Sequence, residues 1–407
     1  MSSKPIQVFE FQKLKIGQNG FNSDHFKALV QFNEHNNNKY FTPVYQGILF
    51  NSYVGVIQIG GLTIEILPKA DNSNNKSLWR DVLLHMLKEC KYLQVDNVSE
   101  TNLKRRYNSI LDVYFEIYLK ELEYLIKIGF IKKYKRKQSN QSALKGKLIF
   151  SQNIQKNLVH KEKFFCEHQV YNKNHLIHQV LLQGLMVIED LKKSNLSDRI
   201  NKLMFEFEDV DKIKVTSNHF EKIIVNRKTQ PYLKAINIAK MLILNYSPNI
   251  SSGNENMLTL LFDMNKLWEE YIYRILQKNK PQGYKVSYQN SDKFWENKKI
   301  KPDIVIADSS GENFVIDTKW KLIYSNKPSD DDLKQMFVYN LHWKSKRSML
   351  LYPQIDQRDS SFGNYKFKID NQENQCKLGF VSVLENGKIK NSKTLCQEIF
   401  DKMTIAS

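Results

Sequence analysis

The pattern of apolar and polar positions is clearest in residues 301–320, KPDIVIADSSGENFVIDTKW. Two short apolar runs, Ile304–Ala307 and Phe314–Ile316, are separated by the turn-forming residues 308–311. Such a pattern is typical of two strands joined by a tight connection. Because successive side chains on a strand point to opposite faces, the spacing also predicts which polar residues come together.

Three charged side chains are predicted to converge on one face of this hairpin. Asp317 and Lys319 are two residues apart and share a face, and Asp303 on the preceding strand can lie on it too. Carboxylate oxygens suit Mg²⁺, which completes its shell with water and substrate phosphate. A lysine beside such a metal can hold and help deprotonate an attacking water. The pattern therefore predicts metal-dependent hydrolysis at phosphorus, although an exposed hairpin with a solvated ion pair has the same spacing.

A helix is predicted downstream, over Asp330–Trp343, and it adds a second element to the pattern. Gln335 and Tyr339 lie four residues apart and therefore on one helix face. Together with the acids and the lysine, this pair resembles the PD-(D/E)xK nuclease superfamily and its RecB-like branch. The segment also fits an ordinary amphipathic helix in which four side chains are buried, and both interpretations can hold together. Those four are Leu333, Met336, Phe337 and Leu341.

The first 70 residues are predicted to be rich in strands. Val56–Ile59 and Leu62–Leu67 flank Gly60-Gly61, a dipeptide that can adopt the positive φ values of a two-residue hairpin turn. A helix capped by Ser77 is expected to run to about Tyr92. A second helix is expected from about residue 110 to residue 128, ending before a glycine.

The most basic stretch follows, because residues 124–161 contain no acid. Its basic side chains are Lys127, Lys132, Lys133, Lys135, Arg136, Lys137, Lys145, Lys147, Lys156 and Lys161. Lys132, Lys133, Lys135 and Arg136 are the predicted DNA contacts, since Tyr134 lies among them and can stack on a base. A solvated helix end and loop is the alternative.

Three more helices are predicted, over residues 174–193, 232–246 and 257–279, with a domain boundary in the Pro, Ser, Gly and Asn cluster at residues 247–256. The first of these helices raises the possibility of a zinc site, but histidines on a helix flank are more often hydrogen-bonded polar residues. The side chains concerned are Cys166, His168, His175 and His178.

Composition narrows the class of partner. The 407 residues include 61 basic and 43 acidic side chains, a formal charge of +18, which favours a polyanionic partner, either nucleic acid or an anionic membrane. No apolar run approaches the roughly 18 residues of a membrane span, and the polar start lacks a signal-peptide core. The four cysteines form no CxxC pair, so a reducing cytoplasm is the expected location. No GxxxxGK[ST] or GxGxxG loop occurs, so any nucleotide hydrolysis is expected from a partner.

Three segments together resemble the McrC family, the nuclease subunit of McrBC-type modification-dependent restriction systems. They are residues 53–69 (YVGVIQIGGLTIEILPK), the basic residues 129–150 with residues 164–181, and residues 260–272 (LLFDMNKLWEEYI). The resemblance extends from about Tyr53 to Tyr352. It implies a C-terminal PD-(D/E)xK nuclease joined to a part that docks on an AAA+ GTPase hexamer, McrB. In the family, the partner recognises double-stranded DNA with modified (methylated) cytosine and hydrolyses GTP, which the nuclease subunit stimulates.

The resemblance also implies roles for single residues. Asp303 and Asp317 correspond to Mg²⁺ ligands and Lys319 to the residue that positions or activates water. Glu269 matches an acidic position that completes the metal shell in related nucleases, and its neighbour Glu270 should point about 100° away on a helix. The support residues are Gln335 and Tyr339.

The expected architecture is mixed α/β in three parts. Residues 1–100 are predicted to form a strand-rich partner-docking domain, residues 101–250 a mainly helical basic region, and residues 251–407 the restriction-endonuclease-like core. The predicted function is that of a Mg²⁺-dependent type IV restriction endonuclease subunit. Two alternatives stay open from the sequence: a non-catalytic adaptor of the GTPase, and a free-standing RecB-like repair nuclease.

Overall fold

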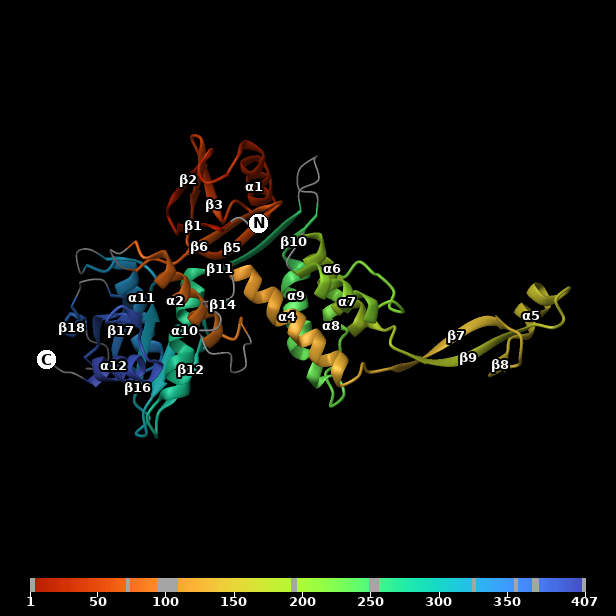
Figure 1. Cartoon of the computed structure of the whole chain (residues 1–407). Helices are drawn as coiled ribbons and strands as arrows, with labels where there is room; N and C mark the ends of the chain where they lie inside the picture. Colours follow the sequence, from red (N-terminus) through yellow and green to blue (C-terminus); the bar gives the residue numbers. More distant parts are fainter. Residues whose placement is uncertain are drawn as a thin grey trace. The chain divides into compact units, whose positions relative to one another are not determined.

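The computed structural model describes residues 4–70, 74–93, 109–191, 196–248, 256–323, 327–354, 358–367 and 373–404. It has the predicted mixed α/β composition, with a strand-rich N-terminal part (Figure 1). The chain forms two compact units, one mainly of Leu111–Leu260 and the other of Lys4–Ile57, Leu62–Ile110 and Leu261–Ser407. The N-terminal and C-terminal parts thus pack within one unit, and the three-part division by function stays a prediction.

The N-terminal part of the larger unit contains two small groups of strands and two helices. The first group includes the parallel pair β1–β6, with Ile6 opposite Ile64, and β6 also lies beside β5. The second is the antiparallel sheet β2-β4-β3. The elements are β1 (Ile6–Phe9), β2 (Lys13–Lys15), α1 (Ser23–His35), β3 (Phe41–Val44), β4 (Gly47–Phe50), β5 (Tyr53–Ile59), β6 (Leu62–Leu67) and α2 (Lys76–Glu89). The strands predicted on either side of Gly60-Gly61 are therefore confirmed.

A six-stranded sheet in the order β12-β15-β16-β17-β19-β18 organises the C-terminal part of the same unit. Strands β16, β17 and β19 run parallel, whereas β12, β15 and β16 form antiparallel neighbours. The six strands are β12 (Lys285–Tyr288), β15 (Ile304–Ala307), β16 (Asn313–Thr318), β17 (Ser345–Pro353), β18 (Gly363–Asn364) and β19 (Gln375–Val381). Two separate strand pairs belong to the same part, β13 (Asp292–Trp295) with β14 (Lys298–Ile300), and β20 (Leu384–Glu385) with β21 (Lys388–Ile389).

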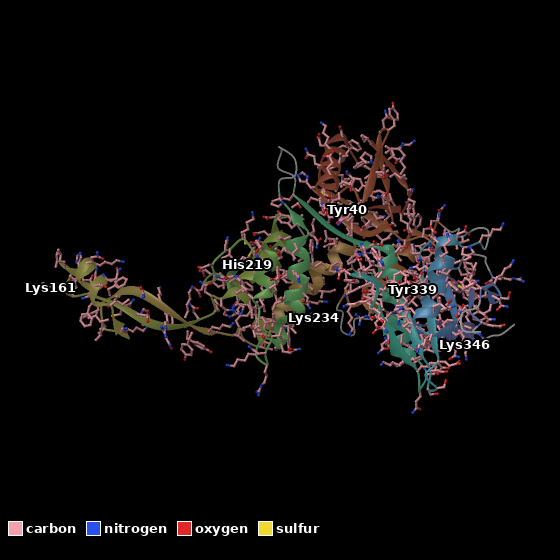
Figure 2. All side chains as sticks on the ribbon, turned by 180° about the vertical axis from the view of Figure 1, so that it is seen from behind. Tyr40, Lys161, His219, Lys234, Tyr339 and Lys346 are labelled. Atoms are coloured by element: carbon pink, nitrogen blue, oxygen red, sulfur yellow. The ribbon has the colours of Figure 1, made fainter. Side chains whose placement is uncertain are left out.

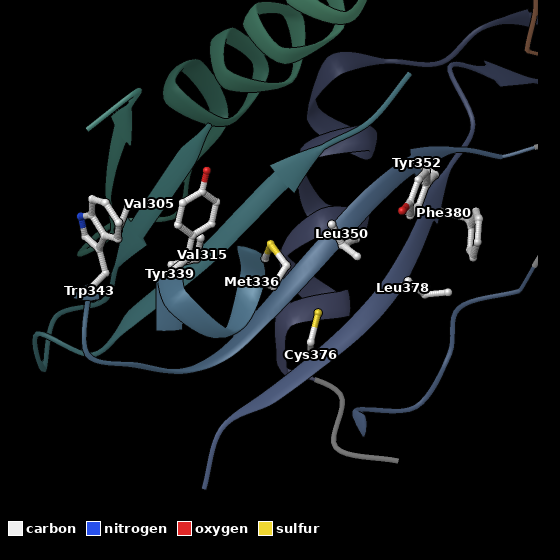
Figure 3. Packing of buried hydrophobic residues seen from close by; sticks show 10 residues of the cluster. All are labelled: Val305, Val315, Met336, Tyr339, Trp343, Leu350, Tyr352, Cys376, Leu378 and Phe380. Carbon is white, nitrogen blue, oxygen red and sulfur yellow. The ribbon is translucent and has the colours of Figure 1, made fainter. Parts of the chain in front are cut away.

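Helices pack against this sheet and fix the position of its strands. Helix α11 (Asp330–His342) buries Met336 and Tyr339 against Val305, Val315 and Leu350 of the sheet (Figure 3). Helices α10 (Met264–Asn279) and α12 (Ser392–Thr404) pack on each other and also on the sheet. Burial of this apolar surface stabilises the sheet by about 25 cal/mol per Å², so the strand ends that carry charged residues are held on a rigid frame.

The smaller unit combines a helical body with a long antiparallel hairpin, β7–β9. Lys161 lies near the tip of this hairpin (Figure 2). The elements of the unit are α4 (Ile110–Lys127), β7 (Lys133–Gln141), β8 (Lys147–Leu148), α5 (Phe150–Asn157), β9 (Phe164–Asn172), α6 (Leu176–Asp190), α7 (Ser197–Glu206), α8 (Ser217–Glu221), η2 (Gln230–Tyr232), α9 (Leu233–Leu244), β10 (Tyr246–Ser247) and β11 (Met257–Asp263).

Two predicted boundaries are corrected. Asn75 rather than Ser77 caps α2, because the Asn75 side chain accepts a hydrogen bond from the Leu78 N–H at 3.1 Å. The prediction of one helix over residues 257–279 is wrong in its first seven residues, which form β11. The apolar run there continues into the helix without a gap, but the Asp263 side chain accepts from the N–H of Asn265 and starts α10. Most of the predicted boundary at 247–256 lies outside the described residues.

Candidate functional site

The register of β15 and β16 brings the three predicted charges together. Ile304 lies opposite Ile316, so Asp303 and Asp317 come next to each other at the same end of the two strands. Asp303 Oδ2 accepts hydrogen bonds from the Thr318 backbone N–H at 2.7 Å and the Thr318 hydroxyl at 2.9 Å. These two bonds fix the Asp303 carboxylate against the following strand.

Lys319 completes the cluster. Its Nζ lies 2.7 Å from Asp317 Oδ2, a strong charge contact, although its direction is not that of a hydrogen bond. The side chain of Asp317 is almost fully buried, at 2% exposure, whereas Lys319 is only partly covered. The ammonium therefore bridges between a buried carboxylate and the solvent.

Helix α11 supplies the support residues in the predicted order. Gln335 Oε1 accepts from Lys319 Nζ at 3.4 Å, and Gln335 Nε2 donates to the Tyr339 hydroxyl at 2.6 Å. Tyr339 in turn donates to the carbonyl oxygen of Lys301 at 2.9 Å, just before Asp303 in the chain. Of the four positions predicted to be buried on this helix, only Met336 is fully so, and Leu333, Phe337 and Leu341 are partly buried.

The two neighbouring glutamates on α10 have different partners. Glu269 accepts a hydrogen bond from Gln289 at 2.6 Å, and its charge raises the pKa of Asp303. Glu270 instead pairs with Arg274 at 2.9 Å and accepts from the Tyr92 hydroxyl at 3.0 Å. Glu269 is thus the glutamate whose charge acts on the cluster, while Glu270 is held by other partners.

Sequence reasoning missed a fourth acid at the cluster, Asp332. Its Oδ1 lies 3.6 Å from Lys319 Nζ and its Oδ2 accepts from Lys321 Nζ at 2.9 Å. The Asp330-Asp331-Asp332 run looks like ordinary acidic residues at a helix N-terminus. The spacing of three residues from Asp332 to Gln335 places both on one helix face, and that signal could have found it.

Burial shifts the protonation equilibria of these groups. Burial, and then the charge of Glu269, raise the pKa of Asp303 to about 6. Burial and the charge of Asp303 raise the pKa of Asp317 to about 7, against the lowering effect of Lys319. For Lys319 burial lowers the pKa, but the surrounding acids outweigh it and the net direction is upward. The site is therefore a group of carboxylates that repel one another and that added positive charge would stabilise.

Two carboxylates of the cluster offer the kind of ligand that Mg²⁺ prefers. In the described residues, no three His, Cys, Asp or Glu side chains are already arranged as a group that could hold a metal ion. Asp303 and Asp317 nonetheless offer hard oxygen ligands, and Asp317 Oδ2 is buried without a hydrogen bond. Because Mg²⁺ usually binds one or two carboxylates and takes water and phosphate for the rest, these residues fit it.

The predicted DNA contacts lie at the base of the β7–β9 hairpin. Lys133, Lys135 and Arg136 are exposed on β7, and Lys132 immediately precedes it, so this stretch is a strand and not the helix end and loop considered as its alternative. Arg136 Nη1 lies 3.8 Å from Glu167 Oε1 on β9. The ring of Tyr134 packs on Tyr171 with centroids 4.7 Å apart. Lys133 and Lys135 lie on one face of the strand and Arg136 on the other.

Two of the four residues considered for zinc, His175 and His178, have other partners. His175 Nε2 contacts the carbonyl oxygen of Ile131 at 3.1 Å, and His178 Nδ1 contacts that of Lys173 at 2.6 Å. The two imidazole rings are 4.3 Å apart. Both histidines thus have the hydrogen-bonding role favoured from the sequence. None of the helices in the described parts of the chain combines the length and the apolar character that a bilayer span requires.

Comparison with solved structures places this fold among known ones. A chain of the refined half-complex from the tetradecameric assembly of Thermococcus gammatolerans McrB AAA+ hexamers with bound McrC is 18% identical, with 98% of this chain and 100% of that chain covered at a TM-score of 0.74. A chain of the cryo-EM structure of the Thermococcus gammatolerans McrBC complex is 19% identical, with 68% and 88% covered at a TM-score of 0.52. At these identities the likeness shows the fold. None of the curated proteins matches this chain.

The fold and the converging charges define a mixed α/β protein with an acidic site at the end of two adjacent strands. The family can be stated from the sequence. A family profile described as the McrBC 5-methylcytosine restriction system component matches residues 48–353, about three quarters of the chain, and the chain belongs to that family. The resemblance seen in the sequence is thereby confirmed.

Proposed function

We propose that this chain is the nuclease subunit of an McrBC-type restriction complex and hydrolyses phosphodiester bonds of DNA that contains modified cytosine. The observation that carries the proposal is the convergence of Asp303, Asp317 and Lys319, with Gln335 behind the lysine. All of these residues lie within the part of the chain that matches the family. A binding module would have no evident need to bury carboxylates beside a lysine, since burial raises their free energy.

In this proposal Asp303 and Asp317 hold Mg²⁺, and Glu269 is a third acid that can bind a metal-bound water. When bound, Mg²⁺ supplies a Lewis acid that stabilises the charge developing on the phosphate. The protein's own part is orientation. Thr318 fixes the Asp303 carboxylate through two hydrogen bonds, and the sheet fixes Asp317. Neither carboxylate needs to reorganise when the substrate binds.

Lys319 positions the attacking water and stabilises the phosphate. An ammonium group has three hydrogen-bond donors, and its contacts with Asp317 and Gln335 leave capacity for a water or a phosphate oxygen. The neighbouring acids raise its pKa, so it carries its charge at neutral pH. Tyr339 holds Gln335 in place and thereby limits the positions that the lysine can adopt.

The energy source and the target recognition are assigned to a partner. The chain contains no GxxxxGK[ST] loop, and one solved structure with a similar fold comes from an assembly of Thermococcus gammatolerans McrB AAA+ hexamers with bound McrC. We infer that an McrB-like AAA+ GTPase hexamer uses the GTP and selects the modified DNA, while this chain docks on it and stimulates hydrolysis. The basic residues at the base of the β7–β9 hairpin then guide the DNA backbone.

The proposal is tested by mixing the full chain with its neighbour-encoded GTPase, GTP, Mg²⁺ and either methylated or unmodified DNA. Cleavage of the methylated DNA alone, abolished by EDTA and restored by Mg²⁺, is the expected result. Stimulated GTP hydrolysis without any cleavage would favour the non-catalytic adaptor. Rapid cleavage of unmodified DNA without the partner would favour the free-standing repair nuclease.

A further inference from the structure

A second hairpin, which the sequence pattern did not single out, leads directly into the acidic site. It consists of β13 and β14, residues 292–300, and is called the site hairpin below. Its last residue, Ile300, is followed by Lys301, Pro302 and Asp303, so it lies beside the cluster in the chain. The register shifts between Lys293 and Trp295, which makes Phe294 the extra residue of a β-bulge. Bulges of this kind re-aim side chains and are common next to active sites.

The base of the site hairpin is tied to the helix that carries Gln335. Asp292 Oδ2 on the first strand lies 3.0 Å from His342 Nε2 at the end of α11. On the second strand, Ile300 packs against the core formed by α11 and the sheet, and the carbonyl of Lys301, the residue after this strand, accepts from the Tyr339 hydroxyl. Both strands are therefore anchored on one element of the site, and the hairpin has a defined position relative to Lys319.

The outer part of the site hairpin exposes two large aromatic rings. Contact of an apolar ring with water raises the free energy of the protein, so such exposure suggests a binding role. Phe294 is 58% exposed and Trp295 is 62% exposed. The remaining residues of both strands are exposed as well, apart from Ile300. Since exposed aromatic rings gain free energy when they stack or become buried, the pair favours a binding partner.

The charge around these rings indicates which partner fits. Residues 292–301 contain four lysines and two acids, and one of the acids, Asp292, already faces His342. Lys293, Lys298 and Lys299 are exposed, and no ion pair joins any of them to an acid in the described residues. Aromatic rings among unpaired lysines are the combination that binds nucleic acid, because bases stack on the rings while the lysines contact phosphate.

We propose that the site hairpin is a DNA-contacting element of the nuclease, with Trp295 and Phe294 against bases or sugars and Lys298 and Lys299 against the backbone next to the cleaved phosphate. This inference rests on the proposed function and adds a specific contact surface to it. A second copy of this chain that docked hairpin to hairpin would be repelled by the lysines, since the same surface would bring the same charge. A DNA duplex is attracted by them.

The test measures binding separately from cleavage. Full-length chain carrying Asp317→Asn, so that DNA stays intact, is titrated with labelled duplex over a range of salt concentrations. Phe294→Ala with Trp295→Ala should weaken binding by at least about thirtyfold, because the contacts of two rings with bases or sugars are lost. Trp295→Phe should retain most of the affinity but lose the quenching of tryptophan fluorescence on DNA addition. Lys298→Gln with Lys299→Gln should lower the slope of log K against log salt by up to about 2.

Tyr45→Ala is the matched control, since Tyr45 is an exposed aromatic, at 83%, on a different part of the same unit. It should leave DNA affinity unchanged. Equal affinity of the double alanine variant and its parent would overturn the inference. So would a change of oligomeric state, or a loss of GTPase stimulation, with normal DNA binding, because the hairpin would then contact a protein. If the wild-type chain binds DNA through the hairpin but cuts none with its partner, only the nuclease proposal fails.

Discussion

Two antiparallel strand pairs of this protein carry charged residues, which are buried in one pair and exposed to water in the other. In β15–β16 the acids are buried, and Asp317 is only 2% exposed. In β7–β9 the basic side chains face water, and the Arg136 side chain is 76% exposed. Burial makes neighbouring charges act strongly on each other, whereas the interactions of charges in water are weak and are screened by salt beyond about 10 Å. The first arrangement suits chemistry at one atom and the second suits a long polyanion.

The largest effect is expected when a charge is removed from the buried pair β15–β16. Asp303→Ala, Asp317→Ala or Lys319→Ala should each lower the rate of DNA cleavage by at least about a thousandfold, since a lost ligand or cation costs several kcal/mol of transition-state stabilisation. Folding and partner binding should persist. Single-turnover cleavage by the complex measures the effect. Asp331→Asn is the control, because that carboxylate is 94% exposed on the same helix as Gln335. Full cleavage by folded Asp317→Ala would disprove the site.

The exposed hairpin should respond differently to neutralisation. Replacing Lys132, Lys133, Lys135 and Arg136 together by Gln should weaken DNA binding about a hundredfold at low salt and flatten the slope of log K against log salt by up to about 3 to 4 units. The loss should be the same for every DNA sequence. Affinity measured from low to high salt checks it. An unchanged slope would show that these residues are solvated and do not contact phosphate. A loss of GTPase stimulation with normal DNA affinity would place them at the partner interface.

A buried acid outside the cluster, Glu10, should affect stability and not chemistry. Burial raises its pKa to about 7, although the Trp320 indole N–H donates to its Oε1 at 2.7 Å and the Lys69 backbone N–H at 3.0 Å. Its Oε2 is buried and has no hydrogen-bond partner in the described residues. Ionisation of Glu10 in the folded protein is therefore unfavourable.

The sign of the pH effect follows from that raised pKa. Between about pH 4.5 and 7 the folded state binds more protons than the unfolded state, so the free energy of unfolding should fall as pH rises, by up to about 3 kcal/mol. Glu10→Gln keeps an acceptor for Trp320 and should make this fall smaller, leaving the part that comes from Asp303 and Asp317. Urea unfolding at pH 5 and pH 8 compares the two proteins. An equal pH dependence in both would show that Glu10 does not contribute to it.

The smallest of these effects is expected for Asp332. Asp332→Asn removes a charge that helps to hold Lys319 and Lys321. A hydrogen bond to a charged group is worth about 1.5–3 kcal/mol when it is lost, but Asp317 still holds the lysine, so cleavage should slow by about tenfold. Single-turnover cleavage beside Asp331→Asn measures this. A rate equal to that of the control would mean that Asp332 has no part in positioning the lysine.

Local spacing was sufficient to predict the central part of the site. The strand alternation around Asp317 and the four-residue spacing from Gln335 to Tyr339 describe neighbours that any strand and any helix must produce. The boundary at Asp263 was missed, because a continuous apolar run has no period that separates a buried strand from the helix that follows it. The N-cap aspartate was the available signal.

Other features depend on packing between distant segments and could not be predicted from spacing. Glu10 and Trp320 are 310 residues apart in the sequence, and only the fold brings them into contact. The same holds for the packing of the N-terminal and C-terminal parts in one unit. The site hairpin was missed for another reason, since its short exposed strands lack the apolar alternation on which strand prediction depends.

The central claim is that DNA is cleaved at the site of the buried acids and guided by the exposed basic side chains of β7–β9. One set of assays on the complex tests this claim most directly. Asp317→Asn and the fourfold hairpin variant are compared with wild type for cleavage of methylated DNA, DNA affinity and GTPase stimulation under identical conditions. The account predicts that Asp317→Asn loses cleavage alone, while the hairpin variant loses affinity and, at saturating DNA, still cuts. Cleavage by Asp317→Asn at the wild-type rate, or normal affinity of the hairpin variant at every salt concentration, would contradict it.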